Sequence, residues 1–163
     1  MHAHEQIIRD FYAAFAARDA VAMARCYHPE IAFSDPAFTM LHGDEATAMW
    51  SMLCTRGKDL ELTLVSASAD ADGGSAHWDA KYTFSQTGRH VHNKIDALFA
   101  FRDGLIVRHV DRFPFWTWAK QAMGPLGLLL GWSWPIKALV RKKAKASLVA
   151  YMERGTHPKP GRG

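Results

Sequence analysis

Cysteine is scarce in this chain, and its two copies fit no metal or redox motif. Cys26 and Cys54 are the only cysteines among 163 residues, which gives no disulfide framework. We therefore expect a reducing, cytoplasmic environment, with both thiols as inert core residues. The first six residues also lack the basic and then apolar pattern of a signal peptide, so export is not expected.

The chain also lacks an apolar run long enough to span a bilayer. The uncharged stretch from Gln121 to Ile136 is shorter than the roughly 20 residues that a spanning helix needs, and glycine and proline interrupt it. Hydrophobic residues make up 48% and charged residues 22%, which is typical of one globular domain at this length.

Positive charge is concentrated at the C-terminus. From Lys137 onward there are eight lysines and arginines against one acid, Glu153, whereas the preceding part has 12 basic and 15 acidic residues. The body therefore offers no nucleic-acid surface, and we expect no nucleic-acid partner. We interpret the basic cluster at 141–145 as a solvated helix face in preference to an RNA or lipid contact.

Hydrophobic periodicity divides the chain into helices followed by strands. Spacings of three and four predict helices over 4–17, 20–27 and 44–53. Alternation with a period of two then predicts strands over 60–69, 76–86, 89–102 and 105–113, separated by glycine-containing turns. This order predicts an α+β fold in which helices cover one face of an antiparallel sheet.

The predicted central hairpin gives one apolar face that carries polar groups. If Thr87-Gly88 is a two-residue turn, Phe84 pairs with Val91 and Tyr82 with Asn93. Ala80 then pairs with Ile95, and Trp78 with Ala97, on the same face. The opposite face carries His90 and His92 without a third ligand, so we expect no metal site.

Asp35-Pro36 is the most informative dipeptide. Its carboxylate lies in an apolar segment between Phe33 and Phe38, where poor hydration raises a carboxyl pKa and suits an acid or base near neutral pH. The alternative is that Asp35 only begins a turn, as Asp-Pro sequences commonly do. In the last strand, Val107, His109, Asp111 and Phe113 share one face, but periodicity does not say whether this face points inward.

A family resemblance is carried by Ile7-Ile8-Arg9-Asp10-Phe11-Tyr12, by Asp19, by Asp35-Pro36, by Thr87-Gly88-Arg89 and by the run 99–109. Over residues 5–113 the chain resembles the SnoaL-like and ketosteroid isomerase branch of the nuclear transport factor 2-like superfamily. The resemblance implies a cone-shaped domain in which a curved, mostly antiparallel sheet and N-terminal helices enclose a pocket. It also implies a homodimer formed through the sheet.

The resemblance assigns roles position by position. Asp35 matches the base of ketosteroid isomerases, but the positions of their two oxyanion donors hold Phe11 and Ala97, so steroid isomerisation of that type is not expected. The match also makes the 107–113 set the cavity side of the last strand. SnoaL-like cyclases use an acidic residue near the end of that strand, which implicates Asp111.

These arguments give one set of candidate site residues. The catalytic candidates are Asp35, with His109 or Asp111 assisting, because an imidazole beside a dry carboxylate and a second aspartate forms a workable acid/base set. The substrate-binding candidates are Tyr12, Trp50, Trp78, Tyr82, Asn93 and Phe113. Core packing is the competing interpretation for the aromatic residues and for His109.

The chain extends beyond the family match. We divide it into a cone domain at 1–113, a helical extension at 114–154 and a flexible tail at 155–163. We expect residues 114–136 to pack on the domain as a lid, a second helical layer or a dimer contact, because their four tryptophans would stabilise it through burial. A membrane-surface contact is the less favoured alternative.

Two function classes remain open from the sequence. The first is a cofactor-independent isomerase, cyclase or hydrolase that acts on a small hydrophobic molecule, with Asp35 as acid or base; a limonene-type epoxide hydrolase is a variant whose Asp-Arg-Asp set cannot be assigned here. The second is a non-catalytic ligand-binding or dimerisation module. Either would be a cytoplasmic homodimer.

Overall fold

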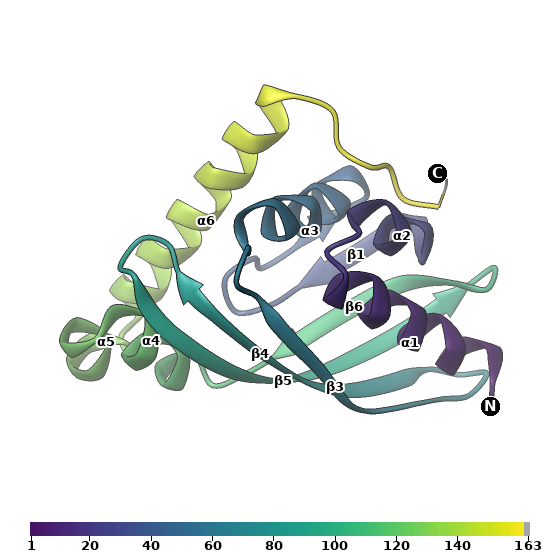
Figure 1. Ribbon diagram of the computed structural model, residues 1–163, viewed down its shortest axis with the longest axis horizontal. Coiled ribbons are helices and arrows are strands. Elements are labelled where there is room, and N and C mark those ends of the chain that lie inside the picture. The colour runs from purple at the N-terminus through teal and green to yellow at the C-terminus, as the bar shows by residue number, and fades with distance from the viewer. Residues whose placement is uncertain (162–163) are drawn as a thin grey trace.

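One curved, open six-stranded sheet forms the centre of the molecule, as seen in a computed structural model that describes residues 1–161 (Figure 1). Its strand order is β2-β1-β6-β5-β4-β3, and every neighbouring pair is antiparallel except β1 and β6. The strands are β1 (Tyr27–Ser34), β2 (Leu41–His42), β3 (Glu61–Ala69), β4 (Gly74–Phe84), β5 (Arg89–Arg102) and β6 (Leu105–Arg112). The predicted α+β class with a mostly antiparallel sheet is confirmed.

Three helices cover the concave face of this sheet (Figure 1). They are α1 (Ala3–Ala16), α2 (Ala20–Arg25) and α3 (Asp44–Arg56), all within a few residues of the predicted ranges. The α1 stripe of Ile8, Phe11 and Phe15 is buried in the main core. Asp19 caps α2 as its spacing indicates, since its carboxylate accepts a hydrogen bond from the Ala22 N–H at 3.0 Å.

The hairpin between β4 and β5 keeps its predicted face but not its predicted register. Tyr82 pairs with Val91, and Trp78 with Ile95, two positions away from the expected partners. The reason is the connection, which is a four-residue turn over 85–88 closed by hydrogen bonds to the Phe84 carbonyl rather than a two-residue turn. A shift of two residues leaves every side chain on its original face.

Strand β1 was not predicted, and the helix expected to run to Tyr27 ends at Arg25 instead. Pro29 hides the strand in the sequence, because proline is disfavoured inside a sheet. The structure tolerates it through an irregularity, in which β1 pairs with β6 at Tyr27 and then only from Ala32 onward.

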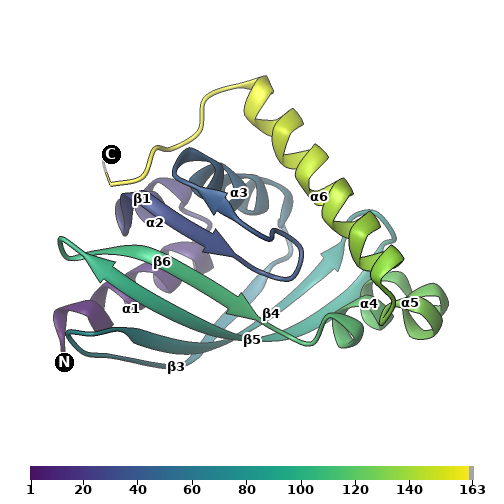
Figure 2. The ribbon, with the colours of Figure 1, turned by 180° about the vertical axis from the view of Figure 1, so that it is seen from behind.

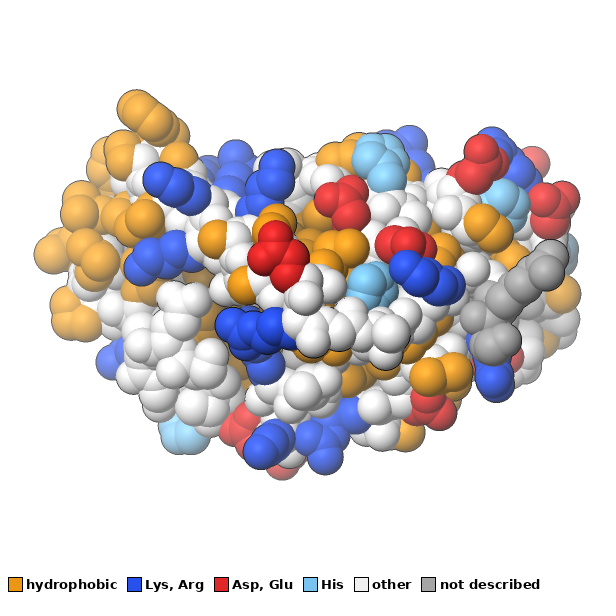
Figure 3. All heavy atoms as spheres, turned by 90° about the horizontal axis from the view of Figure 1, so that it is seen from above, with side chains coloured by type: hydrophobic (Ala, Val, Ile, Leu, Met, Phe, Trp, Pro, Cys, Tyr) orange, Lys and Arg blue, Asp and Glu red, His pale blue; other side chains and the backbone are white. Residues whose placement is uncertain are grey.

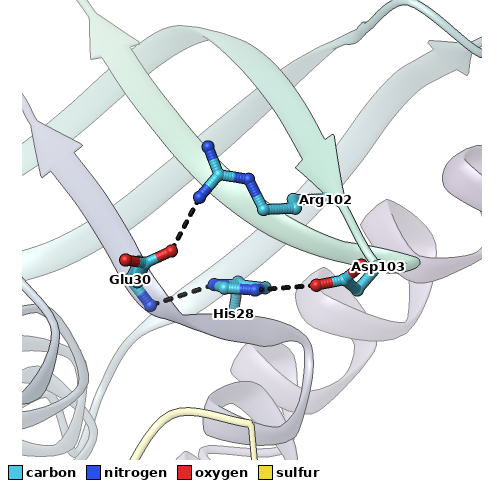
Figure 4. A network of polar contacts seen from close by, with 4 residues as sticks. All are labelled: His28, Glu30, Arg102 and Asp103. Atoms are coloured by element: carbon cyan, nitrogen blue, oxygen red, sulfur yellow. Dashed lines mark hydrogen bonds and ion pairs between the residues drawn. The ribbon is translucent and has the colours of Figure 1, made fainter.

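Polar contacts tie the start of β1 to the turn between β5 and β6 (Figure 4). Arg102 contacts Glu30 at 2.7 Å, and the His28 ring contacts Asp103 at 3.2 Å while accepting the Glu30 N–H at 3.0 Å. The turn itself is the predicted Asp103-Gly104, with φ of 53° and 73°. These contacts are exposed, so they orient the strand more than they stabilise it.

The C-terminal extension forms three helices, α4 (Phe115–Met123), α5 (Pro125–Leu130) and α6 (Trp134–Arg154) (Figure 2). α4 packs against β5, and α6 returns to α3, where the Tyr151 and Ser51 hydroxyls are 2.7 Å apart. Of the four tryptophans, Trp118 is buried, whereas Trp116, Trp132 and Trp134 are exposed. The expected burial is found in full for Trp118 and in part for Trp116, which is 39% exposed, and it is wrong for Trp132 and Trp134.

The segment after α6 runs back along the helical layer. The Gly161 N–H donates to the Ala24 carbonyl at 2.9 Å, and the Lys159 ammonium lies 2.6 Å from the Asp44 carboxylate. Residues 162–163 of the predicted flexible tail lie outside the described residues, and flexibility of this segment stays a prediction. Within residues 1–161, no helix has both the length and the hydropathy for crossing a membrane.

Candidate functional site

Asp35 lies immediately after β1, at the start of a tight turn. Its Oδ1 accepts the N–H groups of Ala37 and Phe38 at 2.7 and 2.6 Å, and its own N–H donates to the Phe38 carbonyl at 2.8 Å. The turn interpretation of Asp-Pro is therefore right. It does not compete with a chemical role, because none of the described residues forms a hydrogen bond with Oδ2.

The parallel pairing of β1 with β6 explains where the Asp35 side chain lies. Phe33 pairs with His109 and Ser34 with Val110, so one further step brings Asp35 level with Asp111. Since side chains alternate along a strand, Asp35 points to the same face as Phe33, the buried face. Asp35 and Asp111, which are far apart in the sequence, thus face the same side of the sheet, and the charge of Asp111 reaches the Asp35 carboxyl.

This environment changes the acidity of Asp35. Burial raises the pKa of its carboxyl to about 7; the two amide N–H groups oppose the rise, and the negative charge of Asp111 adds to it. The residue as a whole is only half-buried, so a path to solvent remains although its carboxyl is surrounded by protein. A carboxyl with this pKa can both accept and release a proton near neutral pH.

Asp111 is held by a chain of buried hydrogen bonds. The Trp50 Nε1–H donates to the Tyr27 hydroxyl at 2.8 Å, which lies 2.7 Å from Nδ1 of His109. Nε2 of His109 lies 2.9 Å from Oδ1 of Asp111. Because the indole only donates, the Tyr27 hydroxyl accepts from Trp50 and keeps its own hydrogen available for Nδ1 of His109, in which case the Nε2–H of His109 donates to Asp111.

His109 cannot reach a ligand directly. It is fully buried, both ring nitrogens are engaged, and the rings of Phe11, Phe33, Trp50 and Phe99 surround it at centroid distances of 4.5 to 5.8 Å. The imidazole contacts the Asp111 carboxylate, and a part for His109 in a reaction stays a prediction. Trp50 belongs to the same core arrangement.

Two further buried donors have no partner within residues 1–161. They are the Tyr12 hydroxyl and the Trp78 indole N–H, whose rings lie 5.5 Å apart. Burial raises the pKa of Tyr12 well above its ordinary value, and the charge of Asp111 adds to this, so the phenol keeps its proton. Buried donors without partners are costly in a folded protein, and a ligand or a water molecule commonly satisfies them.

Asn93 and Phe113 complete the inner face near this group. Asn93 is buried, and its side-chain amide forms no hydrogen bond with any of the described residues. Phe113 is half-buried and packs between the main core and the cluster formed by α4. Sequence reasoning placed both on this face, and their contact with a substrate stays a prediction.

The helix α4 borders the open end of the cone. The Trp118 Nε1–H donates to the Tyr82 hydroxyl at 2.8 Å, and Val91, Phe115, Trp118, Ala119 and Ala122 form a separate buried cluster there. Burial raises the pKa of Tyr82 to about 12, and the charge of Asp35 adds to the rise, which places Asp35 within electrostatic reach of this end.

The β4–β5 hairpin is fastened to the C-terminal end of α4. The Thr87 hydroxyl donates to the Ala122 carbonyl, and the Arg89 Nε–H donates to the Gln121 carbonyl at 2.9 Å. The His92 N–H donates to the Gln121 side chain at 2.8 Å. An open groove next to these bonds is lined by Asp59, Lys81, Tyr82, His90, His92 and Gln121. Of the candidate site residues only Tyr82 lines it, and an enclosed apolar pocket stays a prediction.

The two cysteines lie away from this chemistry. Burial raises the pKa of Cys26 to about 12 and that of Cys54 to about 11, so neither thiol is a nucleophile at neutral pH. In the part of the chain that the structure covers, no three His, Cys, Asp or Glu side chains are grouped to hold a metal ion.

A comparison with protein families now identifies the fold. A family model described as the SnoaL-like domain matches residues 8–109, which is more than half of the chain. The chain belongs to the SnoaL-like family. The matched range contains Asp35 and His109 and ends two residues before Asp111. No curated protein sequence matches this SnoaL-like chain.

Solved structures show the same cone fold. An NTF2-like protein of unknown function from Burkholderia pseudomallei is 21% identical, with a TM-score of 0.62, covering 70% of this chain and 92% of its own. A protein with a ketosteroid isomerase-like fold from Catenulispora acidiphila, in complex with trimethylamine, is 14% identical, with a TM-score of 0.64 and coverage of 74% and 94%.

An LEH-like epoxide hydrolase from M. tuberculosis is 14% identical, with a TM-score of 0.63 and coverage of 78% and 96%. At these identities the likeness shows the fold alone. The recognition of a SnoaL-like, NTF2-like chain is confirmed.

Sequence reasoning missed Tyr27, which links Trp50 to His109. The helical pattern of 20–27 concealed it, because Tyr27 fits the apolar stripe of that helix as well as the first inward position of β1. Inward alternation of Ile31 and Phe33 with the polar residues around them was the available signal for β1.

Proposed function

We propose that this SnoaL-like protein binds a small hydrophobic molecule inside the cone and moves a proton on it without a cofactor, with Asp35 as the acid or base. The observation that carries the proposal is the Asp35 carboxyl, with its pKa of about 7, its Oδ1 held by two amides and its Oδ2 without a hydrogen-bond partner among residues 1–161. Such a group is oriented, partly dehydrated and ready to exchange a proton.

The surrounding donors favour proton abstraction next to a carbonyl group. When Asp35 takes a proton from carbon, the bonding electrons move toward the carbonyl oxygen, which becomes negatively charged. The Tyr12 hydroxyl and the Trp78 N–H are buried donors that lack partners in the described part of the chain and could stabilise this oxygen. They would replace the donors missing at Phe11 and Ala97. Return of the proton to another carbon completes an isomerisation. A cyclisation is completed when the enolate carbon attacks a second carbonyl carbon and the resulting alkoxide takes the proton back from Asp35.

Asp111 would act on the same molecule from the same inner face of the sheet as Asp35. Its Oδ1 is held by His109, and its charge raises the pKa of Asp35. Asp111 would therefore help Asp35 to hold a proton near neutral pH and to pass it to the substrate.

Hydrogen–deuterium exchange tests the reaction class directly. The protein is incubated in deuterated water with small hydrophobic ketones, and deuterium incorporation beside the carbonyl is followed by NMR. We expect exchange that is lost in Asp35→Asn and reduced about 10²-fold or more in Tyr12→Phe. Asp72→Asn, an exposed aspartate, is the matched control. Exchange that persists in Asp35→Asn would remove Asp35 from the chemistry.

A second candidate is a non-catalytic binding or dimerisation module of the same fold. It is favoured by α4, whose Trp118 bonds Tyr82 at the open end of the cone and restricts access. Native mass spectrometry of the purified protein distinguishes the two. A co-purified molecule that remains unchanged and binds equally to the parent protein and Asp35→Asn supports the module.

We also propose that the protein is a cytoplasmic homodimer that pairs through the outer face of its sheet. The free, buried Cys26 and Cys54 suit a reducing compartment. Leu98 is exposed on the outer face of β5, beside the exposed Lys94 and Asp96, and offers an apolar contact for a second copy. Light scattering would report the mass, and Leu98→Asp should give monomers.

A further inference from the structure

The outermost part of the C-terminal extension exposes a concentrated group of large apolar side chains. The apolar tip, defined here as residues 126–134, contains Leu129 and Trp132, each 68% exposed, and Trp134, which is 78% exposed. Leu126, Leu128 and Leu130 are exposed as well. Figure 3 shows hydrophobic side chains gathered at this end of the molecule, with Lys and Arg side chains beside them. A patch of this kind on a folded chain marks an interaction site.

Contacts with α4 and hydrogen bonds within the extension hold the backbone of the tip in place. Its large apolar side chains therefore remain on the outside. Gly127 packs so closely on α4 that a Cβ there would overlap the carbonyl oxygen of Ala119. The Trp116 indole N–H donates to the Leu128 carbonyl at 3.1 Å, and the Trp132 indole N–H donates to the Leu129 carbonyl at 2.9 Å. The one polar atom of the Trp132 side chain is therefore satisfied before the ring meets any partner.

The charges around the tip have one sign. No aspartate or glutamate occurs from Phe113 to Met152, whereas this stretch contains Lys120, Lys137, Arg141, Lys142, Lys143 and Lys145. None of the six pairs with an acidic side chain within residues 1–161. The Lys120 ammonium lies 4.6 Å from the centre of the Trp116 ring, which brings positive charge next to the apolar tip.

We propose that the apolar tip docks on the surface of a membrane that contains anionic lipids. Leucine side chains would enter the outer acyl region, Trp132 and Trp134 would lie at the headgroup level that tryptophan prefers, and the lysines would meet lipid phosphates and carboxylates. A second copy of the chain is a poorer partner, because Lys120 and Lys137, which lie against aromatic rings of α4, would approach the same lysines of the other copy across the contact. The outward orientation of Trp132 and Trp134, which the proposal requires, could not be read from the sequence alone.

Vesicle cosedimentation of the full chain tests the proposal. The probes are vesicles of phosphatidylcholine with about one third phosphatidylserine, and vesicles of phosphatidylcholine alone. We expect binding to the anionic vesicles that is at least about tenfold stronger than to the neutral ones and that weakens with added salt. Binding should also shift tryptophan emission to shorter wavelength, since two of the six tryptophans leave water.

Two variants distinguish membrane binding through the apolar tip from non-specific adsorption of the protein to vesicles. Leu129→Asp combined with Trp134→Asp should lower partitioning at least about tenfold and leave the melting temperature unchanged, because both positions are exposed. Val21→Asp, an exposed aliphatic position on α2, should bind like the parent protein. Failure of the parent chain to bind anionic vesicles would overturn the proposal. So would equal binding by the tip variant, or conversion of a dimer to monomers by that variant in the absence of lipid.

Discussion

The Tyr27 hydroxyl and Nδ1 of His109, which are 82 positions apart in the sequence, lie 2.7 Å apart in the core. This contact joins the first inward position of β1 to the middle of β6, and through His109 it reaches Asp111. The position of the second carboxylate therefore depends on a residue that no ligand needs to touch.

Removing this hydroxyl should destabilise the protein. Tyr27→Phe leaves the Trp50 N–H and Nδ1 of His109 without partners in the core, and we expect a loss of about 1–3 kcal/mol in the free energy of unfolding. Tyr12→Phe is the matched control, since its hydroxyl has no partner within residues 1–161, and it should be neutral or stabilising. Urea unfolding measures both, and equal losses would contradict the hydrogen-bond chain.

Stability should fall as the pH rises from about 4 to about 7. The folded protein holds a proton on Asp35 up to a pKa of about 7, whereas the unfolded chain releases it near pH 4. Asp35→Asn removes this loss, so at pH 8 it should be more stable than the parent by about 1–3 kcal/mol, a range that allows for solvent around a half-buried residue. The difference in stability between Asp35→Asn and the parent should vanish below about pH 4. Asp72→Asn, which keeps Asp35, should follow the parent at every pH. Parallel pH profiles for the parent and Asp35→Asn would refute the raised pKa.

Trp118 and Trp134 should differ sharply in their contribution to stability. Trp118 is buried in the cluster under α4 and bonds Tyr82, so Trp118→Ala should cost about 3–5 kcal/mol. Trp134→Ala should stay within about 0.5 kcal/mol, because the ring is 78% exposed. Thermal unfolding of both variants measures this. A similar loss for the two would mean that the apolar tip packs on the domain in solution.

Gly127 should tolerate no side chain. Gly127→Ala places a Cβ on the Ala119 carbonyl, which should separate α5 from α4 and lower the melting temperature by several degrees for a cost of about 1–3 kcal/mol. Gly155→Ala is the control, because its Cβ would meet open space in an extended backbone. Differential scanning calorimetry compares them, and an unchanged transition for Gly127→Ala would argue against the close helix contact.

The sequence predicted the elements with strong periodicity and failed where local signals conflict. β5 and β6 alternate clearly, so their ranges were predicted well, whereas the inward direction of the face with His109 and Asp111 came from the resemblance and not from periodicity. β1 was not, because Pro29 opposes a strand and its stability comes from pairing with β6, a contact far away in the sequence. The hairpin register failed for a related reason, since turn length is set by the closing hydrogen bonds rather than by Thr87-Gly88 alone.

The sequence indicated two candidate carboxylates but not the contacts that hold them, and their role in a site stays a prediction. Asp35 was found from its apolar flanks, and Asp111 from the resemblance, but the bond from Tyr27 to His109 depends on the parallel register. The direction of Trp132 and Trp134 was equally inaccessible, because composition indicates that tryptophan should be buried and does not say on which side of α4 it lies.

Three hydrogen bonds join residues 87–92 of the β4–β5 hairpin to the C-terminal end of α4, so the hairpin and this helix should move together. Withdrawal of Trp118 from Tyr82 would then carry the end of β4 and β5 along, so entry into the cone would require part of the sheet to open. Access would be governed by a slow, cooperative opening rather than by a fast loop motion. Amide exchange in α4 and in the β4–β5 hairpin should consequently proceed at a common rate, and the residence time of any enclosed molecule would follow that rate.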